Sequence, residues 1–282
     1  MILLDNNQII LANIFQTMKQ VDTIDENILR HMVLNTYRMY RSMFKDEYGE
    51  LVVCHDSSNC WRKDLFEYYK QNRKAKQDES DVDWKSIYDA LHKIRTEIDE
   101  NFPYKNIKVE RAEADDIIAV LCQEYSDKEK ILILSNDKDF KQLQYSENVK
   151  QYSCIKKDYL VCDDPKMFLV DHIIRGDTSD GIPNILSDCD TFVDKSKRQK
   201  RLTKTIVNDI METYKMTGLP PEYCMSGWKR NESLIDLNFI PDTIRGEVIH
   251  QYDTNGFGDR SKILNYMIEN RLKNLIGNIE DF

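Results

Sequence analysis

The 282-residue sequence lacks the signals of a membrane or exported protein. No run of apolar residues approaches the ~18 that a membrane-spanning helix needs. The opening segment MILLDNNQII has neither a basic stretch nor a cleavage site, so no signal peptide is expected. We therefore expect a cytoplasmic protein without a membrane partner.

Cysteine and histidine are present, but they form no pattern of ligands or disulfides. The seven cysteines are an odd number, no CxxC pair occurs, and the five histidines do not have zinc-ligand spacing. Neither a disulfide framework nor structural zinc is expected, and the thiols are expected to be reduced and partly buried.

Nucleotide-binding motifs are missing too. Neither a Walker A loop nor GxGxxG occurs, which argues against a nucleotide-driven motor and against a dehydrogenase. Internal repeats and low-complexity tracts are also absent. The apolar content of 41% and the mean hydropathy of −0.61 are instead typical of one large α/β domain, or of a domain with an appendage.

The net charge of −9 argues by itself against nucleic acid, because phosphate binding usually needs a basic surface. Acidic groups gathered in a metal site are, however, neutralised by the ions that they hold, and basic residues can form a separate patch. The positions of the charges are therefore more informative than their sum.

Three short apolar runs, at residues 2–4, 51–54 and 131–134, are each followed closely by an aspartate. These aspartates are Asp5, Asp56 and Asp137. Apolar runs of this length favour strands buried on both faces of a parallel sheet. Helical patterns over residues 27–43 and 84–98 separate the runs and predict right-handed crossovers. A ligand site is expected at the carboxyl ends of these strands, unless the aspartates merely form turns.

A second acidic group begins the helical pattern at residues 110–125. Glu113, Asp115 and Asp116 are crowded into four positions, and their charges repel one another unless a cation compensates them. The alternative is that they complement the dipole at the start of a helix.

Two further pairs of aspartates follow. Asp139 is two residues from Asp137, so the two are expected to face the same side of an extended chain. Asp177 and Asp180 precede a Gly-Ile-Pro turn, where the alternative is an Asx turn or a helix cap.

Together these segments supply nine candidate metal ligands. They are Asp5, Asp56, Glu113, Asp115, Asp116, Asp137, Asp139, Asp177 and Asp180. Oxygen ligands without histidine or cysteine suit hard cations such as magnesium or manganese. Two such ions about 4 Å apart activate a water and stabilise the leaving oxygen of an in-line displacement. The expected reaction is hydrolysis of a phosphodiester.

The segment WRKDLFEYYKQNRKAK, residues 61–76, combines cations with aromatic rings. Its helical pattern predicts one face that carries both cations and aromatic rings, with two more lysines, Lys63 and Lys74, nearby. The residues of this face are Arg62, Phe66, Tyr69, Lys70 and Arg73. Cations bind phosphate and rings stack on unpaired bases, so we expect a helical arch that binds DNA. Arg62 or Lys70 is expected to stabilise charge on the transferring phosphate. The alternative is an ordinary solvated helix with aromatic residues in the core.

A second basic run, KSKRQKRLTK at residues 195–204, follows the Gly-Ile-Pro turn. Its candidate DNA-binding cations are Lys195, Lys197, Arg198, Lys200 and Arg201. The run is expected either to lie along a duplex backbone or to be merely solvated. Helical patterns over residues 205–214 and 261–275 predict a small helical part after about residue 185.

The segments LLD, VCHD, WRKDLFEYYKQNRK, EADDIIAVL, SNDKDF and GDTSDGIPN together resemble the flap endonuclease and 5′-3′ exonuclease family, including its branch in T-even bacteriophages. Each segment is short, but their order and spacing are specific, and the similarity runs nearly end to end. The resemblance implies an α/β nuclease domain over residues 1–184, with a central, mostly parallel sheet flanked by helices and an arch at about 57–80. It implies a smaller, mainly helical DNA-binding part over residues 185–282.

The resemblance also implies an activity. Members remove RNA primers and adjacent DNA from lagging-strand fragments by 5′-3′ exonuclease, flap endonuclease and ribonuclease H activity, on flapped or nicked DNA and on RNA-DNA hybrids. Two Mg²⁺ ions, which Mn²⁺ can replace, are the implied cofactors. The implied setting is a monomeric phage protein in the host cytoplasm, with a sliding clamp and a single-strand-binding protein as partners.

By motif, the resemblance assigns Asp5, Asp56, Asp115 and Asp137 to a first metal site. Asp139, Asp177 and Asp180 are assigned to a second, Glu113 and Asp116 to the same acidic motif, and Arg62 and Lys70 to the catalytic arch. Cellular members have a second glycine-rich turn after Gly-Ile-Pro, often around potassium. Here Asn184-Ile185-Leu186 follows, so the potassium site is not carried over.

Two alternatives to this function stay open at this point. One is a ribonuclease resembling the PIN-domain enzymes, which have an acidic site on a similar sheet and act on single-stranded RNA. The other is a branched-DNA binding module that does not cut. The arch and the Gly-Ile-Pro element argue against the first, and the full acidic set argues against the second.

Overall fold

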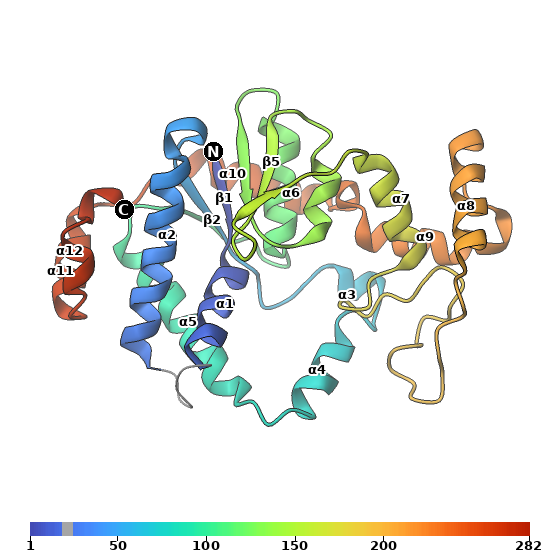
Figure 1. Ribbon diagram of the computed structural model, residues 1–282, viewed down its shortest axis with the longest axis horizontal. Coiled ribbons are helices and arrows are strands. Elements are labelled where there is room, and N and C mark those ends of the chain that lie inside the picture. The colour runs from blue at the N-terminus through green and yellow to red at the C-terminus, as the bar shows by residue number, and fades with distance from the viewer. Residues whose placement is uncertain (19–24) are drawn as a thin grey trace. The chain divides into compact units, whose positions relative to one another are not determined.

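The computed structural model describes residues 1–18 and 25–282 (Figure 1). The chain divides into two compact units. The sheet unit comprises Met1–Asn59, Asp83–Val161 and Asp242–Phe282, and the helical unit comprises Cys60–Val82 and Cys162–Pro241. The linear boundary expected after residue 184 stays a prediction. Within the described ranges, no helix is both long and apolar enough to cross a membrane.

The sheet unit is built on a six-stranded sheet in the order β3-β2-β1-β4-β5-β6. The strands are β1 (Ile2–Asp5), β2 (Leu51–Cys54), β3 (Lys105–Ile107), β4 (Ile131–Leu134), β5 (Val149–Ser153) and β6 (Asp158–Leu160). All neighbours are parallel except β5 and β6, which are antiparallel. The prediction of a mostly parallel sheet with three neighbouring buried strands is confirmed, because β2, β1 and β4 are adjacent and every residue in them is buried.

Helices lie between the strands, and most of the expected ones are present. In the sheet unit they are α1 (Asn6–Met18), α2 (Glu26–Tyr48), α5 (Trp84–Asn101), α6 (Ala114–Tyr125), α10 (Asp242–Thr254), α11 (Ser261–Glu269) and α12 (Lys273–Ile276), with the 3₁₀ turns η1 (Lys138–Leu143) and η4 (Ile279–Asp281). Asp25 and Asp83 begin α2 and α5 by accepting backbone N–H groups of the first turn.

The strand order explains where a ligand would bind. The chain moves from β1 through β2 to β3 in one direction, and then crosses to β4 and β5 on the other side of β1. Right-handed crossovers therefore place α1, α2 and α5 on one face of the sheet and α6 on the other. The direction reverses between β1 and β4, and the crevice of such a sheet lies at their carboxyl ends. Asp5 and Asp137 are at these ends.

One expected helix is interrupted. The pattern over residues 261–275 predicts a single helix, but the chain forms α11 and α12 with a break between them. Arg271 has a positive φ of 56°, and the Leu272 N–H turns back to the Met267 carbonyl at 2.8 Å. This is a left-handed helix ending, which the apolar periodicity of the segment does not reveal.

The helical unit contains α3 (Arg62–Leu65), α4 (Gln71–Asp78), α7 (Pro165–Arg175), α8 (Lys204–Thr217) and α9 (Met225–Ile235), with the 3₁₀ turns η2 (Glu222–Cys224) and η3 (Leu237–Phe239). The expectation of one continuous helical face over residues 61–76 is wrong. Lys70 has a positive φ of 59°, which separates α3 from α4. Phe66 and Tyr69 are buried beside this turn, so two short helices replace the single face.

Candidate active site

The buried carboxylate of Asp5 is surrounded by acidic residues at the carboxyl edge of the sheet. Burial, followed by the negative charges of Asp56 and Asp137, raises the pKa of Asp5 to about 7. The Gln8 N–H and the Ser135 hydroxyl each donate to this carboxylate at 3.2 Å and oppose that rise. The structure therefore brings together three aspartates that the sequence places after three different strands.

Asp56 is held by donors from two helices. Its Oδ1 accepts the Ala114 N–H at 2.7 Å, and its Oδ2 accepts the side-chain amide of Asn7. Ala114 is the first residue of α6, so the helix dipole also favours a negative charge at this position. Asn7 is in the first turn of α1. These contacts fix the direction in which the Asp56 carboxylate points.

Glu113 and Asp116 form a capping box at the start of α6. Each side chain accepts the backbone N–H of the other residue, and the bond from Glu113 N to Asp116 Oδ2 is 2.9 Å long. Asp116 is fully buried. The capping box gives both carboxylates a structural role at the start of the helix, and their role as metal ligands stays a prediction.

Asp115 differs from the two residues that flank it in the acidic motif. It is half-buried, and its charge acts on the Cys54 thiol at the end of β2. Burial raises the pKa of Cys54 well above its ordinary value, and the charges of Asp5 and Asp115 are among those that raise it further. Asp115 is therefore close to the strand end that precedes Asp56.

Asp137 and Asp139 lie in a turn after β4. Asp137 caps η1, and its Oδ1 accepts the Asp139 N–H at 2.9 Å while its own N–H donates to the Ser135 hydroxyl at 3.1 Å. Gln151 of β5 donates to the Asp137 carbonyl at 2.6 Å. The expectation that both aspartates face one side of an extended chain is wrong, because the chain enters a 3₁₀ helix at Lys138.

The set of residues that the sequence assigned to a first metal site, Asp5, Asp56, Asp115 and Asp137, has the side-chain chemistry that a hard divalent cation needs, and its binding of one ion stays a prediction. It offers carboxylate oxygens, which Mg²⁺ and Mn²⁺ prefer, and no thiolate or imidazole from these four positions. The like charges that raise the pKa of Asp5 are unfavourable without compensation, and a cation between them would remove that repulsion.

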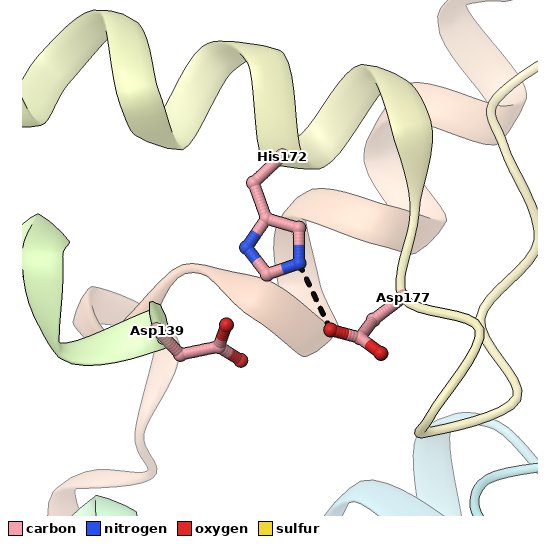
Figure 2. Close-up of side chains that lie close together, drawn as sticks. All are labelled: Asp139, His172 and Asp177. Carbon is pink, nitrogen blue, oxygen red and sulfur yellow. Dashed lines mark hydrogen bonds and ion pairs between the residues drawn. The ribbon is translucent and has the colours of Figure 1, made fainter. Parts of the chain in front are cut away.

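In the helical unit, Asp177 organises the turn that follows α7. Its Oδ1 accepts the Ser179 N–H at 2.7 Å and the Asp180 N–H at 3.3 Å. Its Oδ2 pairs with Nε2 of His172 at 3.1 Å, as Figure 2 shows, and both side chains are buried. This is the Asx turn that the sequence offered as an alternative. The assignment of Asp139, Asp177 and Asp180 to a second ion stays a prediction.

Asp180 is enclosed by the basic segment of the same unit. Its carboxylate accepts the Tyr69 hydroxyl at 2.9 Å, lies 3.6 Å from the Lys70 ammonium, and pairs with the Arg73 guanidinium. Its carbonyl accepts the Lys70 N–H at 2.7 Å. These contacts explain why the chain turns at Lys70, since the left-handed residue lets both its N–H and its side chain meet Asp180.

Arg62 and Lys70, the predicted catalytic cations, have different surroundings. Arg62 is 3% exposed, its Nε donates to the Leu234 carbonyl at 2.9 Å, and its guanidinium lies 4.5 Å from the centroid of the Trp61 ring. Lys70 is half-buried beside Asp180. Their catalytic roles stay predictions.

The predicted DNA-binding side chains differ in exposure and in whether they have an acidic partner. Lys197 pairs with Asp190 at 2.7 Å, and Lys195 lies 3.2 Å from Glu79. The Tyr69 ring is buried rather than presented to solvent. The exposed cations are Lys63, Arg73, Lys74, Lys195, Arg198, Lys200 and Arg201, and two of them, Arg73 and Lys195, also have acidic partners. Exposure is compatible with both phosphate binding and simple solvation, so DNA binding by these residues stays a prediction.

Several polar residues that support the acidic group were not predicted. Asn7, Gln8 and Ser135 donate to the strand-end aspartates, and the sequence signal for them is that each lies two or three residues from Asp5 or Asp137. His172 carries no such signal, because its partner Asp177 lies beyond the end of α7 and a turn brings the two together.

Two family models account for the whole chain. Residues 1–169 match the 5′-3′ exonuclease N-terminal resolvase-like domain, and residues 163–282 match the C-terminal region of T4 RNase H. The chain is 30% identical to Ribonuclease H of Enterobacteria phage T4 over 292 aligned positions, which cover 99% of this chain and 95% of that protein.

Solved structures with low sequence identity have the same fold. The bacteriophage T5 5′-exonuclease with bound zinc gives a TM-score of 0.64 at 15% identity, covering 90% of this chain and 98% of that one. A bacteriophage T5 flap endonuclease complex with DNA and metal ions gives a TM-score of 0.63 at 14% identity, covering 95% and 97%. With the two family models and the phage T4 relative, this fold leads to one conclusion: the chain belongs to the 5′-3′ exonuclease family, in the branch with a T4 RNase H C-terminal region, and it is a nuclease.

Proposed function

We propose that this nuclease is a 5′-3′ exonuclease and flap endonuclease that removes RNA primers and adjacent DNA during lagging-strand replication. The proposed chemistry is two-metal hydrolysis of a phosphodiester with Mg²⁺. The observation that carries the proposal is the crowding of Asp56 and Asp137 around the buried Asp5, at the edge where the sheet direction reverses.

In this proposal, Asp5, Asp56, Asp115 and Asp137 hold the first ion. These carboxylates would hold divalent ions, whose chemistry would be to activate a water and neutralise charge on the scissile phosphate. The residues of the chain orient the carboxylates beforehand, since Asn7 and the Ala114 N–H direct Asp56.

The substrate in this proposal is branched, nicked or flapped DNA, or an RNA-DNA hybrid. The support is the set of exposed cations in the helical unit, which suits a phosphate backbone. Further support is that a solved structure with a similar fold is a bacteriophage T5 flap endonuclease in complex with DNA. A sliding clamp and a single-strand-binding protein are proposed as partners from the resemblance alone.

A cleavage assay with three 5′-labelled substrates tests the function. With Mg²⁺, the protein should cut a DNA flap and an RNA-DNA hybrid but not unstructured RNA. The double variant Asp137→Asn/Asp139→Asn should lose cleavage and keep measurable flap binding, whereas the exposed Asp127→Asn control should behave as wild type.

Two results would contradict the proposal in different ways. Persistent cleavage by the double variant would disprove the metal assignment. Cleavage of unstructured RNA alone would instead support the ribonuclease resembling PIN-domain enzymes.

A further inference from the structure

The residues directly beside two of the strand-end aspartates are bonded to each other. Asn6 follows Asp5, His55 precedes Asp56, and the Asn6 side-chain nitrogen lies 2.8 Å from His55 Nδ1. Asn6 and His55 are 0% and 1% exposed. No part of the site described above uses either side chain.

The hydrogen-bond partners of the His55 ring match one of its tautomers. An amide nitrogen only donates, so His55 Nδ1 accepts from Asn6 and the ring proton is on Nε2. Nε2 faces two acceptors, Asn106 Oδ1 at 3.1 Å and Asp99 Oδ1 at 3.2 Å. At the other end, the buried Tyr37 hydroxyl donates to Asn6 Oδ1.

This network begins where the backbone ladder of the sheet ends. The last register pair between β1 and β2 is Asp5 with Cys54, and β1 then becomes α1. The residues that follow this pair are Asn6 and His55, and the hydrogen bond between their side chains links the two chain segments beyond the end of the backbone ladder. On the far side, the His55 N–H donates to the Ile107 carbonyl of β3 at 3.0 Å. The carboxyl ends of three strands are thereby tied together.

A tie at this place has a specific consequence. Asp5 and Asp56 carry like charges at the ends of adjacent strands, and repulsion would drive them apart beyond the last register pair of β1 and β2. The buried network resists such a shift, because movement of either strand end would leave polar atoms of Asn6 and His55 without hydrogen-bond partners.

We propose that Asn6 and His55 are positioning residues, which set the separation of the Asp5 and Asp56 carboxylates before a divalent ion binds. This inference rests on the proposed metal-dependent function. Residues that hydrogen-bond directly to metal ligands typically change metal affinity about 10- to 100-fold when they are removed, and a network joined to the ligands through the main chain should act at the lower end of that range. A side chain that only fills the core would change folding stability instead.

The first test compares Mn²⁺ binding, measured by electron paramagnetic resonance, in four full-length proteins. His55→Leu should weaken Mn²⁺ binding about tenfold and lower kcat on a flap, with little change in flap affinity measured without metal. His55→Gln should restore most of the binding, because its amide can accept from Asn6 and donate to Asn106. Ile133→Val, which shortens a buried side chain of β4, serves as a control for lost stability alone and should bind Mn²⁺ normally.

A milder variant covers the case in which His55→Leu does not fold. Tyr37→Phe removes only the hydroxyl at the end of the network, lets the Asn6 amide turn over, and should weaken Mn²⁺ binding severalfold. Normal Mn²⁺ affinity in each folded variant of His55 and Tyr37 would overturn the inference. Mn²⁺ binding is measured without substrate, so it tests this inference separately from the proposed function. If the wild type does not cut flaps, the proposed function is disproved, and the Mn²⁺ affinities of the variants still decide the inference.

Discussion

The α-carbon of Gly227 lies against the main chain of Ile185, so closely that a β-carbon on Gly227 would stand 1.9 Å from the Ile185 carbonyl oxygen. Gly227 is in the first turn of α9, and Ile185 follows the Gly-Ile-Pro turn. The atoms that a β-carbon on Gly227 would meet belong to the main chain of Ile185, which cannot turn aside as a flexible side chain could. Helix and turn can therefore pack at this distance only when residue 227 has no side chain.

Gly227→Ala should destabilise the protein by about 1–3 kcal/mol or more, because the helix or the turn must move to admit the methyl group. Thermal and urea unfolding would measure the loss. Gly246→Ala is the matched control, since its β-carbon meets nothing within 4 Å and it lies inside α10. That variant should instead gain roughly 0.5–1 kcal/mol from helix propensity. Equal effects of the two substitutions would show that the contact at Ile185 is not tight.

The same turn is held by the guanidinium of Arg230. Its terminal nitrogens donate to three main-chain carbonyls, those of Pro183 at 2.8 Å, Asn184 at 3.0 Å and Ser187 at 3.0 Å. Convergent carbonyl oxygens could otherwise bind a monovalent cation, and here a side chain supplies the positive charge. We therefore expect the melting temperature to be the same in potassium and in tetramethylammonium at equal ionic strength.

Substitution of Arg230 provides the second half of this prediction. Arg230→Met leaves three carbonyls without their charged donor and should lose about 1–3 kcal/mol of stability. Arg230→Lys should recover little, because one ammonium cannot reproduce the fork of donors. A wild-type melting temperature that falls when potassium is removed would contradict the role given to the guanidinium.

The pKa of Asp5 predicts how the metal-free protein responds to pH. Because burial and its acidic neighbours raise the folded-state pKa from 3.8 to about 7, the folded state binds this proton more tightly than the unfolded state. The stabilisation of the folded state by the bound proton of Asp5 is fully present below about pH 4, and it is lost as the pH rises to about 7. One pKa unit corresponds to roughly 1.4 kcal/mol, so the change is of the order of a few kcal/mol.

Urea unfolding in EDTA between pH 4 and 8 would measure this loss. Asp5→Asn should be more stable than wild type above pH 7 and should show a smaller fall over the range. Asp127→Asn, an exposed substitution in the sheet unit, should follow the wild-type curve. Wild-type and Asp5→Asn curves of the same shape would mean that Asp5 is not protonated in the folded protein.

The sheet and its acidic edge could be predicted from local sequence, and the reason is physical. Strands such as β1 and β4 are buried on both faces, so their apolar runs are continuous and their ends are marked by the first charged residue. Once the strands are parallel, Asp5 and Asp137 must meet at one edge. No knowledge of distant contacts is needed for either step.

The basic segment could not be predicted in the same way. Its periodicity indicates one helix, but Lys70 adopts a left-handed conformation because Asp180, more than a hundred residues later, accepts both its N–H and the Tyr69 hydroxyl. The His172–Asp177 pair has the same character, since a turn rather than a helical repeat joins its members. Local propensity is overridden where such tertiary hydrogen bonds are formed.

The contacts of Asp180 predict how firmly the basic segment is held. Asp180→Asn keeps the shape of the side chain but removes the charge that faces Lys70 and Arg73, so α4 should detach more often from the turn at Asp180. Trypsin should then cut after Arg73 or Lys74 severalfold faster than in wild type, as mass spectrometry of the fragments would show. The Arg73 side chain is about half exposed, so solvent screens its pair with Asp180 and most of the effect should come from Lys70.

Two comparisons make this last prediction specific. Asp163→Asn removes an exposed charge in the helical unit and should leave the cleavage rate unchanged. Tyr69→Phe removes one bond to Asp180 without changing any charge, and should give an intermediate rate. If Asp180→Asn is cut no faster than Asp163→Asn, the hydrogen bonds from Asn72 to Thr178 and from Arg73 to Ser179 are sufficient to hold the segment, and the Asp180 charge is not needed for that purpose.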